Sequence, residues 1–213
     1  MKTDDLVAML ATRIEPIDTK WTVMRYVIAI AGGTAAALAL TGGVLRFNPG
    51  LSRAVFEPTF WIRECYCAAL GLLGLIAVTR LARPGVRLGF VPAVIGAVVL
   101  GMWVLGTMEL LTALPQRRAH LLLGTTATVC PFLIALVAAP LFIAFLWVLR
   151  GFAPTRLRLA GAAAGFAAGS VGALVYSLHC PELAAPFLGF WYLFGMLIPT
   201  ALGASLGPRL LSW

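Results

Sequence analysis

The amino-acid sequence predicts an all-α polytopic membrane protein with six transmembrane helices and both termini in the cytoplasm. The composition, the length of the apolar runs and the distribution of Lys and Arg predict it. Hydrophobic residues make up 61% of the chain and charged residues 11%, with a mean hydropathy of +0.97. A soluble domain usually carries about 25% charged residues, so this chain has too little polar surface to stay in water.

The apolar runs are long enough to cross a bilayer, which takes roughly 20 helical residues. Backbone groups in lipid must pair internally, and these runs lack the alternation of a barrel strand, so they are predicted to be helices. We expect the helices at residues 22–45, 61–79, 89–111, 128–149, 159–179 and 187–206. The prediction divides the chain into a cytoplasmic amphipathic segment (1–21), a transmembrane domain (22–206) and a short cytoplasmic tail (207–213).

The basic residues between the helices predict the orientation. Ten of them fall on the side of the termini: Lys2, Arg13, Lys20, Arg80, Arg83, Arg87, Arg150, Arg156, Arg158 and Arg209. Five fall on the other side: Arg46, Arg53, Arg63, Arg117 and Arg118. Positive charge favours the cytoplasm, which places the termini inside. The net charge of +8 is therefore attributed to topology and to contact with anionic membrane lipid, not to nucleic acid.

The N-terminal segment is predicted to form a short amphipathic helix. Thr3 can cap it, acidic residues follow in the first turn, and apolar residues recur at helical spacing. The candidate partner-binding residues are Asp4, Asp5, Leu6, Met9, Leu10 and Ile14. Either the bilayer or the groove of a cytoplasmic partner could cover this stripe. The two acids favour the partner, because helices on a membrane surface are usually basic.

Four cysteines are predicted at the outward ends of helices: Cys65, Cys67, Cys130 and Cys180. Cys130 and Cys180 are expected to be neighbours, because their helices are joined by a short inner loop. A disulfide, a soft metal ion bound by the thiolates with His179 as an accessory ligand, and simple packing all remain open. Cys65 and Cys67 form C-x-C, not the C-x-x-C of redox enzymes.

Other polar and aromatic residues receive structural interpretations. Glu109 is expected to pair with Arg117, Arg118 or Arg63 near the interface. The aromatic belt is expected to include Trp61, Trp191 and Tyr192, and the glycines Gly161, Gly165 and Gly169 are expected to let helices pack closely.

The sequence contains no P-loop, GxSxG or HExxH motif, so an enzyme is not expected, and no resident cofactor is predicted. A small transporter or channel for a metal ion is the alternative, but it would need polar groups at mid-membrane depth. A thiol oxidoreductase is a third hypothesis, for which C-x-C is a poor basis.

At the cysteines the sequence resembles the NrsF-type six-helix bacterial anti-sigma factors, and the resemblance covers essentially the whole chain. It is carried by MKTDDL at the start, Cys130–Pro131, APT at 153–155, GAAAGFAAG at 161–169, YSLHCPE at 176–182, PF at 186–187, WY at 191–192 and the ending LGPRLLSW. The HCPE…PF…WY combination is its most specific part.

The resemblance implies a function. Such proteins hold an extracytoplasmic-function sigma factor at the inner membrane and release it under stress, notably heavy-metal stress. Two outward-facing cysteines take part in sensing in that family, and Cys130 and Cys180 match their positions. Cys65 and Cys67 have no such match. The oligomeric state is not predicted.

Overall fold

The structure is a computed structural model that describes residues 19–152 and 154–212. Its described part is all-helical. The elements are α2 (Thr19–Leu40), the π-helical turn η1 (Thr41–Leu45), α3 (Leu51–Ala54), α4 (Pro58–Leu81), α5 (Val91–Thr112), α6 (Pro115–Leu123), α7 (Cys130–Arg150), α8 (Leu157–Tyr176), α9 (Ala185–Phe187), the π-helical turn η2 (Leu188–Tyr192) and α10 (Leu193–Leu210). Within these residues, six helical segments are long and apolar enough to span a membrane, which confirms the predicted number.

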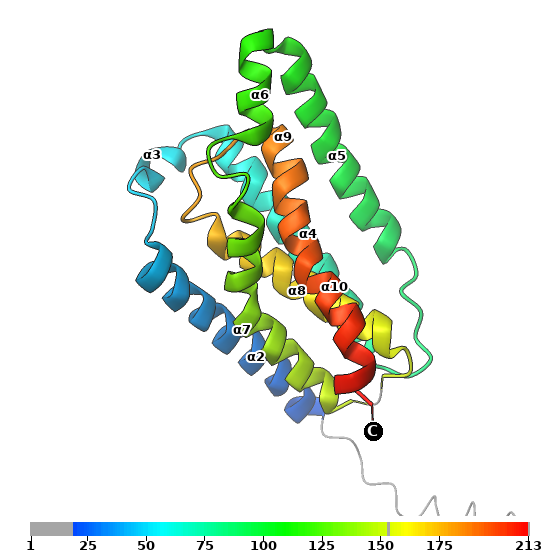
Figure 1. Ribbon diagram of the computed structural model, residues 1–213. Helices are drawn as coiled ribbons and strands as arrows, with labels where there is room; N and C mark the ends of the chain where they lie inside the picture. Colours follow the sequence, from blue (N-terminus) through cyan, green and yellow to red (C-terminus); the bar gives the residue numbers. More distant parts are fainter. Residues whose placement is uncertain (1–18, 153, 213) are drawn as a thin grey trace, which may run out of the picture.

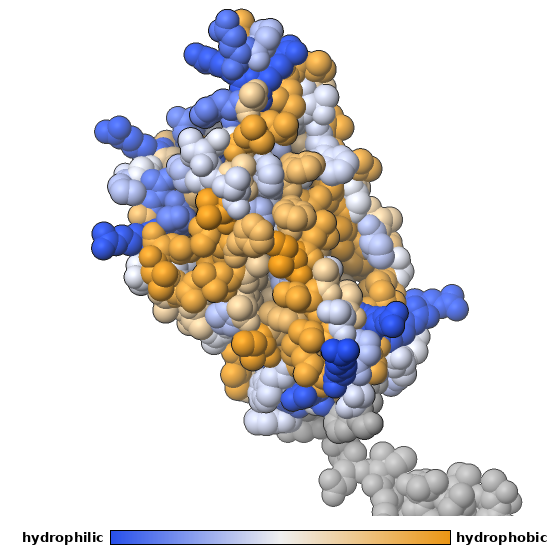
Figure 2. All heavy atoms as spheres, viewed as in Figure 1, coloured by the Kyte–Doolittle hydropathy of each residue, from blue (hydrophilic) through white to orange (hydrophobic). Residues whose placement is uncertain are grey.

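The surface agrees with a membrane environment. Figure 2 shows hydrophobic side chains across the middle of the visible face and hydrophilic ones gathered towards its two ends. The chain is thus a multi-pass membrane protein. Helix boundaries lie close to those expected, and several are set by a proline in the first turn, where no N–H partner is needed (Pro58, Pro92, Pro115, Pro131 and Pro186).

Helix α8 forms the centre of the bundle and packs against α4, α7 and α10 (Figure 1). It can do so because its faces carry Gly and Ala. A Cβ added at Gly165 would collide with the Pro199 carbonyl of α10, and one at Gly172 would lie 2.8 Å from Ala138 Cα of α7. The packing role predicted for the glycine repeat is confirmed, since only small residues allow backbones to approach this closely in lipid. Helix α5 is the least buried of the six and stands at the side of the bundle (Figure 1).

The bundle has two chemically different ends. The arginine end comprises the start of α2, the loops after α4 and α7, and the end of α10. Here Arg80 donates to Leu88 O at 2.8 Å, Arg150 to Leu210 O at 2.7 Å and Arg25 to Trp147 O at 3.2 Å. These arginines therefore tie loops and helix ends together, in addition to carrying charge.

The cysteine end is the opposite one. It comprises residues 46–57, 113–129 and 177–184 with the adjoining helix ends. All described carboxylates lie at this end: Glu57, Glu64, Glu109 and Glu182.

Candidate functional site

Cys130 and Cys180 meet at the cysteine end. Cys130 is the first residue of α7, and Cys180 lies in the loop that follows α8. Their side chains are within hydrogen-bonding reach of each other, and both are buried, at 0% and 2% exposure. Both are free thiols in this structure. The expected juxtaposition of these two cysteines is therefore present.

Local backbone geometry places the two thiols. The Cys130 N–H donates to Thr126 O at 2.8 Å at the start of α7, and the Cys180 N–H donates to Tyr176 O at 3.1 Å just beyond α8. The Thr126 hydroxyl lies 4.0 Å from Cys180 Sγ. The turn that leads into α7 thus contacts both cysteines.

The surroundings favour the thiolate form of Cys180. A hydrogen bond from the Cys130 thiol lowers the pKa of Cys180, against the opposing effect of burial. The Glu182 backbone N–H, the Tyr192 hydroxyl and the positive charge of Arg63 lower this pKa further. The thiolate is the form of cysteine that attacks electrophiles and binds metal ions, so these contacts suit Cys180 to either chemistry.

Two buried tyrosines line the pair. Tyr176 and Tyr192 are 1% and 0% exposed, and their rings lie 6.0 Å apart. The prediction that Tyr192 belongs to an interfacial aromatic belt is wrong, because Tyr192, the last residue of the π-helical turn η2, is fully buried. Its hydroxyl lies close enough to Cys180 to lower the pKa of that thiol. Trp61 and Trp191 do lie at this end, donating to Val55 O and Leu122 O.

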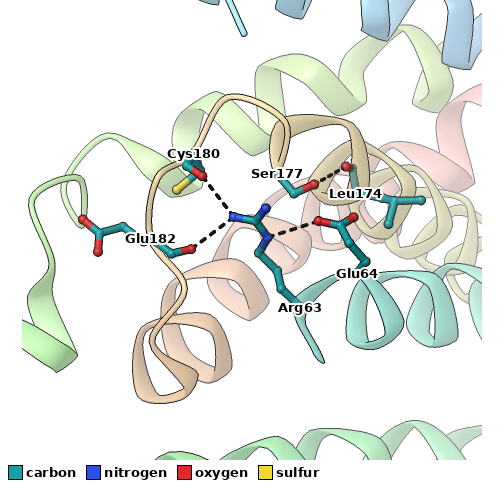
Figure 3. A network of polar contacts seen from close by, with 6 residues as sticks. All are labelled: Arg63, Glu64, Leu174, Ser177, Cys180 and Glu182. Atoms are coloured by element: carbon teal, nitrogen blue, oxygen red, sulfur yellow. Dashed lines mark hydrogen bonds and ion pairs between the residues drawn. The ribbon is translucent and has the colours of Figure 1, made fainter. Parts of the chain in front are cut away.

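A buried arginine lies beside Cys180 (Figure 3). Arg63 of α4 is 1% exposed, and its Nη1 donates to Cys180 O at 3.0 Å and to Glu182 O at 3.2 Å. Its Nε donates to Glu64 Oε1 at 3.1 Å. Sequence reasoning placed Arg63 at the interface and missed this position. The signal was present, because Arg63 is spaced by three and four residues from Phe60 and Cys67, which are buried on the same helix face.

Two carboxylates at this end, those of Glu109 and Glu182, accept hydrogen bonds from backbone N–H groups. Glu109 Oε2 accepts from the Ala185 N–H at 2.9 Å, so the expected pairing of Glu109 with an arginine is wrong. Ala185 is the first residue of α9, and its N–H has no partner within that helix. In the described ranges, the one ion pair joins Arg63 to Glu64.

The accessory candidates are arranged differently from the pair. His179 is half-buried, its Nδ1 lies 2.7 Å from Arg46 O, and its ring packs against Tyr176. Cys65 is exposed and Cys67 is fully buried, because residues two apart point to opposite faces of α4. These residues share the cysteine end with the pair but are not gathered into one ligand set: across 19–152 and 154–212, no three His, Cys, Asp or Glu side chains are grouped to hold a metal ion. The tentative metal site therefore offers two thiol sulfurs.

The candidate partner-binding residues (Asp4, Asp5, Leu6, Met9, Leu10 and Ile14) lie outside the described residues, and their predicted role stays a prediction.

Comparison with known proteins shows the family to which the sequence is similar. The family NrsF, described as "Negative regulator of sigma F", matches residues 10–213. The chain is 46% identical to a probable anti-sigma-F factor NrsF of Azospira oryzae and 40% identical to an anti-sigma-F factor NrsF of Caulobacter vibrioides. Both matches cover 100% of this chain and 100% of the relative. No solved structure matches the chain significantly.

Proposed function

This chain is a member of the NrsF family of negative regulators of sigma F, and we propose that it holds an extracytoplasmic-function sigma factor at the bacterial inner membrane until a thiol-reactive signal reaches Cys130 and Cys180. It is an anti-sigma factor, a regulatory protein and not an enzyme. Its partner is a sigma factor.

The observation that carries the sensing proposal is the buried thiol pair at the end of the bundle opposite the start of α2 and the end of α10. The arginine count of ten to five supports a cytoplasmic arginine end, and so a periplasmic pair. The N-terminal stripe and the cytoplasmic loops are then the surfaces available to the sigma factor.

The signal acts on two sulfur atoms that are buried in the protein. A soft divalent cation such as cadmium binds both sulfurs as thiolates and releases whatever protons they still carry, whereas a two-electron oxidant takes two electrons from the sulfurs, with release of the same protons, to leave a disulfide. Either product needs a sulfur separation different from that of the buried thiols. The start of α7, which holds Cys130, and the loop after α8, which holds Cys180, must therefore shift relative to one another.

The shift can reach the other end of the molecule. Helices α7 and α8 join through a short loop at the arginine end, and Arg150 at the end of α7 binds Leu210 O at the end of α10. A movement at the thiols therefore displaces the ends of three helices near the start of α2. To release the partner, the signal must bias the two states by a few kcal/mol.

A metal transporter or channel receives little support. Within 19–152 and 154–212 the buried polar residues are Thr41, Arg63, Ser170 and Ser177, and the first, second and fourth lie towards the cysteine end. Ser170 donates to Phe166 O of its own helix. These groups do not form a polar path across the bundle.

Co-purification tests the partner. Tagged full-length protein is extracted from unstressed membranes and from cadmium-treated membranes, and the bound proteins are identified. A sigma factor should elute with the unstressed sample and be depleted from the treated one. Absence of any sigma factor from the unstressed sample would contradict the proposed function.

A further inference from the structure

By volume, Arg63 is the largest fully buried side chain in the described part of the chain. Removing a guanidinium from water is costly unless its donors and its charge are satisfied. One carboxylate, that of Glu64, faces it. Because a buried ion pair contributes little net stability, the specific contacts of Arg63 are better evidence for its role.

Those contacts converge on one short segment. A single nitrogen, Nη1, binds the carbonyl oxygens of Cys180 and Glu182, on either side of Pro181. A side chain of α4 therefore holds the backbone at Cys180 in place (Figure 3).

The same segment is fixed from a second side. The Glu182 carboxylate accepts from the Thr125 N–H at 2.7 Å and from the Thr125 hydroxyl at 2.8 Å. Thr125 belongs to the turn that leads into Cys130. Residues 180–182 are thus a bridge between α4 and the start of α7, and Arg63 is its attachment to α4.

We propose that Arg63 is the positioning residue of the thiol pair: its guanidinium holds residues 180–182 so that Cys180 stays buried against Cys130 in the resting protein. The inference rests on the proposed function, since it assigns the resting geometry of the sensing site. An arginine suits this position because its planar, permanently charged group presents several donors at fixed angles, which lysine cannot do.

Peptide-resolved alkylation of the full-length protein in membranes tests this role. N-ethylmaleimide should label exposed Cys65 quickly and buried Cys67 and Cys180 slowly. In Arg63→Gln, labelling of Cys180 should accelerate on the order of tenfold, the effect of losing a charge-assisted hydrogen bond on a local opening equilibrium. Cys67, one turn away on α4, should stay slow. Arg53→Gln removes an exposed arginine of the same end and should match the wild type.

Arg63→Lys separates positioning from general stability. Lysine keeps a cationic donor without the fork, so Cys180 should be labelled at a rate between those of the wild type and Arg63→Gln, with Cys67 again protected. Unchanged labelling of Cys180 in both variants would overturn the proposal. So would parallel acceleration of Cys67 and Cys180 in Arg63→Lys, which would show a general structural role.

Transcription by the sigma factor in unstressed cells distinguishes this inference from the function on which it rests. If Arg63→Gln exposes Cys180 selectively, basal transcription should rise several-fold, because the resting geometry is lost. Selective exposure with basal transcription at the wild-type level would uphold the positioning role of Arg63 and contradict sensing at the thiol pair.

Discussion

Glu182 and Thr125 join the loop that holds Cys180 to the turn that precedes Cys130. The carboxylate accepts hydrogen bonds from both the N–H and the hydroxyl of Thr125, at 2.7 and 2.8 Å. Gly124 makes room for this contact: its φ is +54°, and a Cβ there would lie 2.7 Å from the Glu182 carboxylate. The position of Cys180 is thereby linked to that of Cys130 through side chain and backbone alike.

Removing this link should destabilise the cysteine end. Glu182→Ala removes both hydrogen bonds to Thr125; because Thr125 is exposed, water can replace the lost acceptor, and we expect a loss of about 1 kcal/mol of unfolding free energy. Thermal unfolding of the purified protein in detergent should show a lower midpoint, while Glu57→Ala, which changes an exposed carboxylate of the same end, should leave the midpoint in place. Equal midpoints for both variants would show that the contact does not hold the loops.

Close packing at the centre of the bundle requires glycine, which has no side chain. Gly165→Ala places a Cβ against the Pro199 carbonyl, where backbone on both sides prevents relief. We expect a loss of about 1–3 kcal/mol, measured as a lower unfolding midpoint. Gly96→Ala on α5 is the matched control, because nothing lies within 4 Å of its Cβ position. A Gly165→Ala protein as stable as Gly96→Ala would contradict the close packing of α8 on α10.

The orientation remains a prediction from charge. Reporter fusions at Asn48, Gln116 and Glu182 should all report the periplasm, since these residues belong to the cysteine end. A fusion at Arg83 should report the cytoplasm. Cytoplasmic signals at two of the first three sites would reverse the topology and with it the access of an external signal to the thiols.

The N-terminal stripe should bind the sigma factor. A charge at Leu6→Glu or Leu10→Glu removes the apolar contact, so transcription by the sigma factor should rise without stress. Ala8→Glu puts the same charge on the opposite face of the expected helix and should keep repression. If both stripe variants are inserted normally and still repress, the stripe covers lipid and the sigma factor binds elsewhere.

Sequence patterns predicted the six spans well, because the length and uniformity of an apolar run report directly on membrane crossing. They also predicted that Cys130 and Cys180 would meet, since a short loop makes the helices antiparallel neighbours. They failed for Arg63, Glu109 and Tyr192. A polar residue near a helix end is expected to face the interface, whereas Arg63 and Tyr192 are both buried in the core. Which backbone N–H a carboxylate binds depends on loop paths that no local pattern encodes.

Modification of the thiol pair is proposed to release the sigma factor, and the double variant Cys130→Ser and Cys180→Ser tests this step. Serine keeps the approximate size and a hydrogen-bonding group but is a far poorer nucleophile and soft-metal ligand. The measurement is transcription by the sigma factor before and after cadmium or a thiol oxidant. Because the pair rests as reduced thiols in this account, the variant should repress normally and stay repressed under either stress. A variant that represses normally and still releases the sigma factor under stress would show that Cys130 and Cys180 are structural, and would contradict the account.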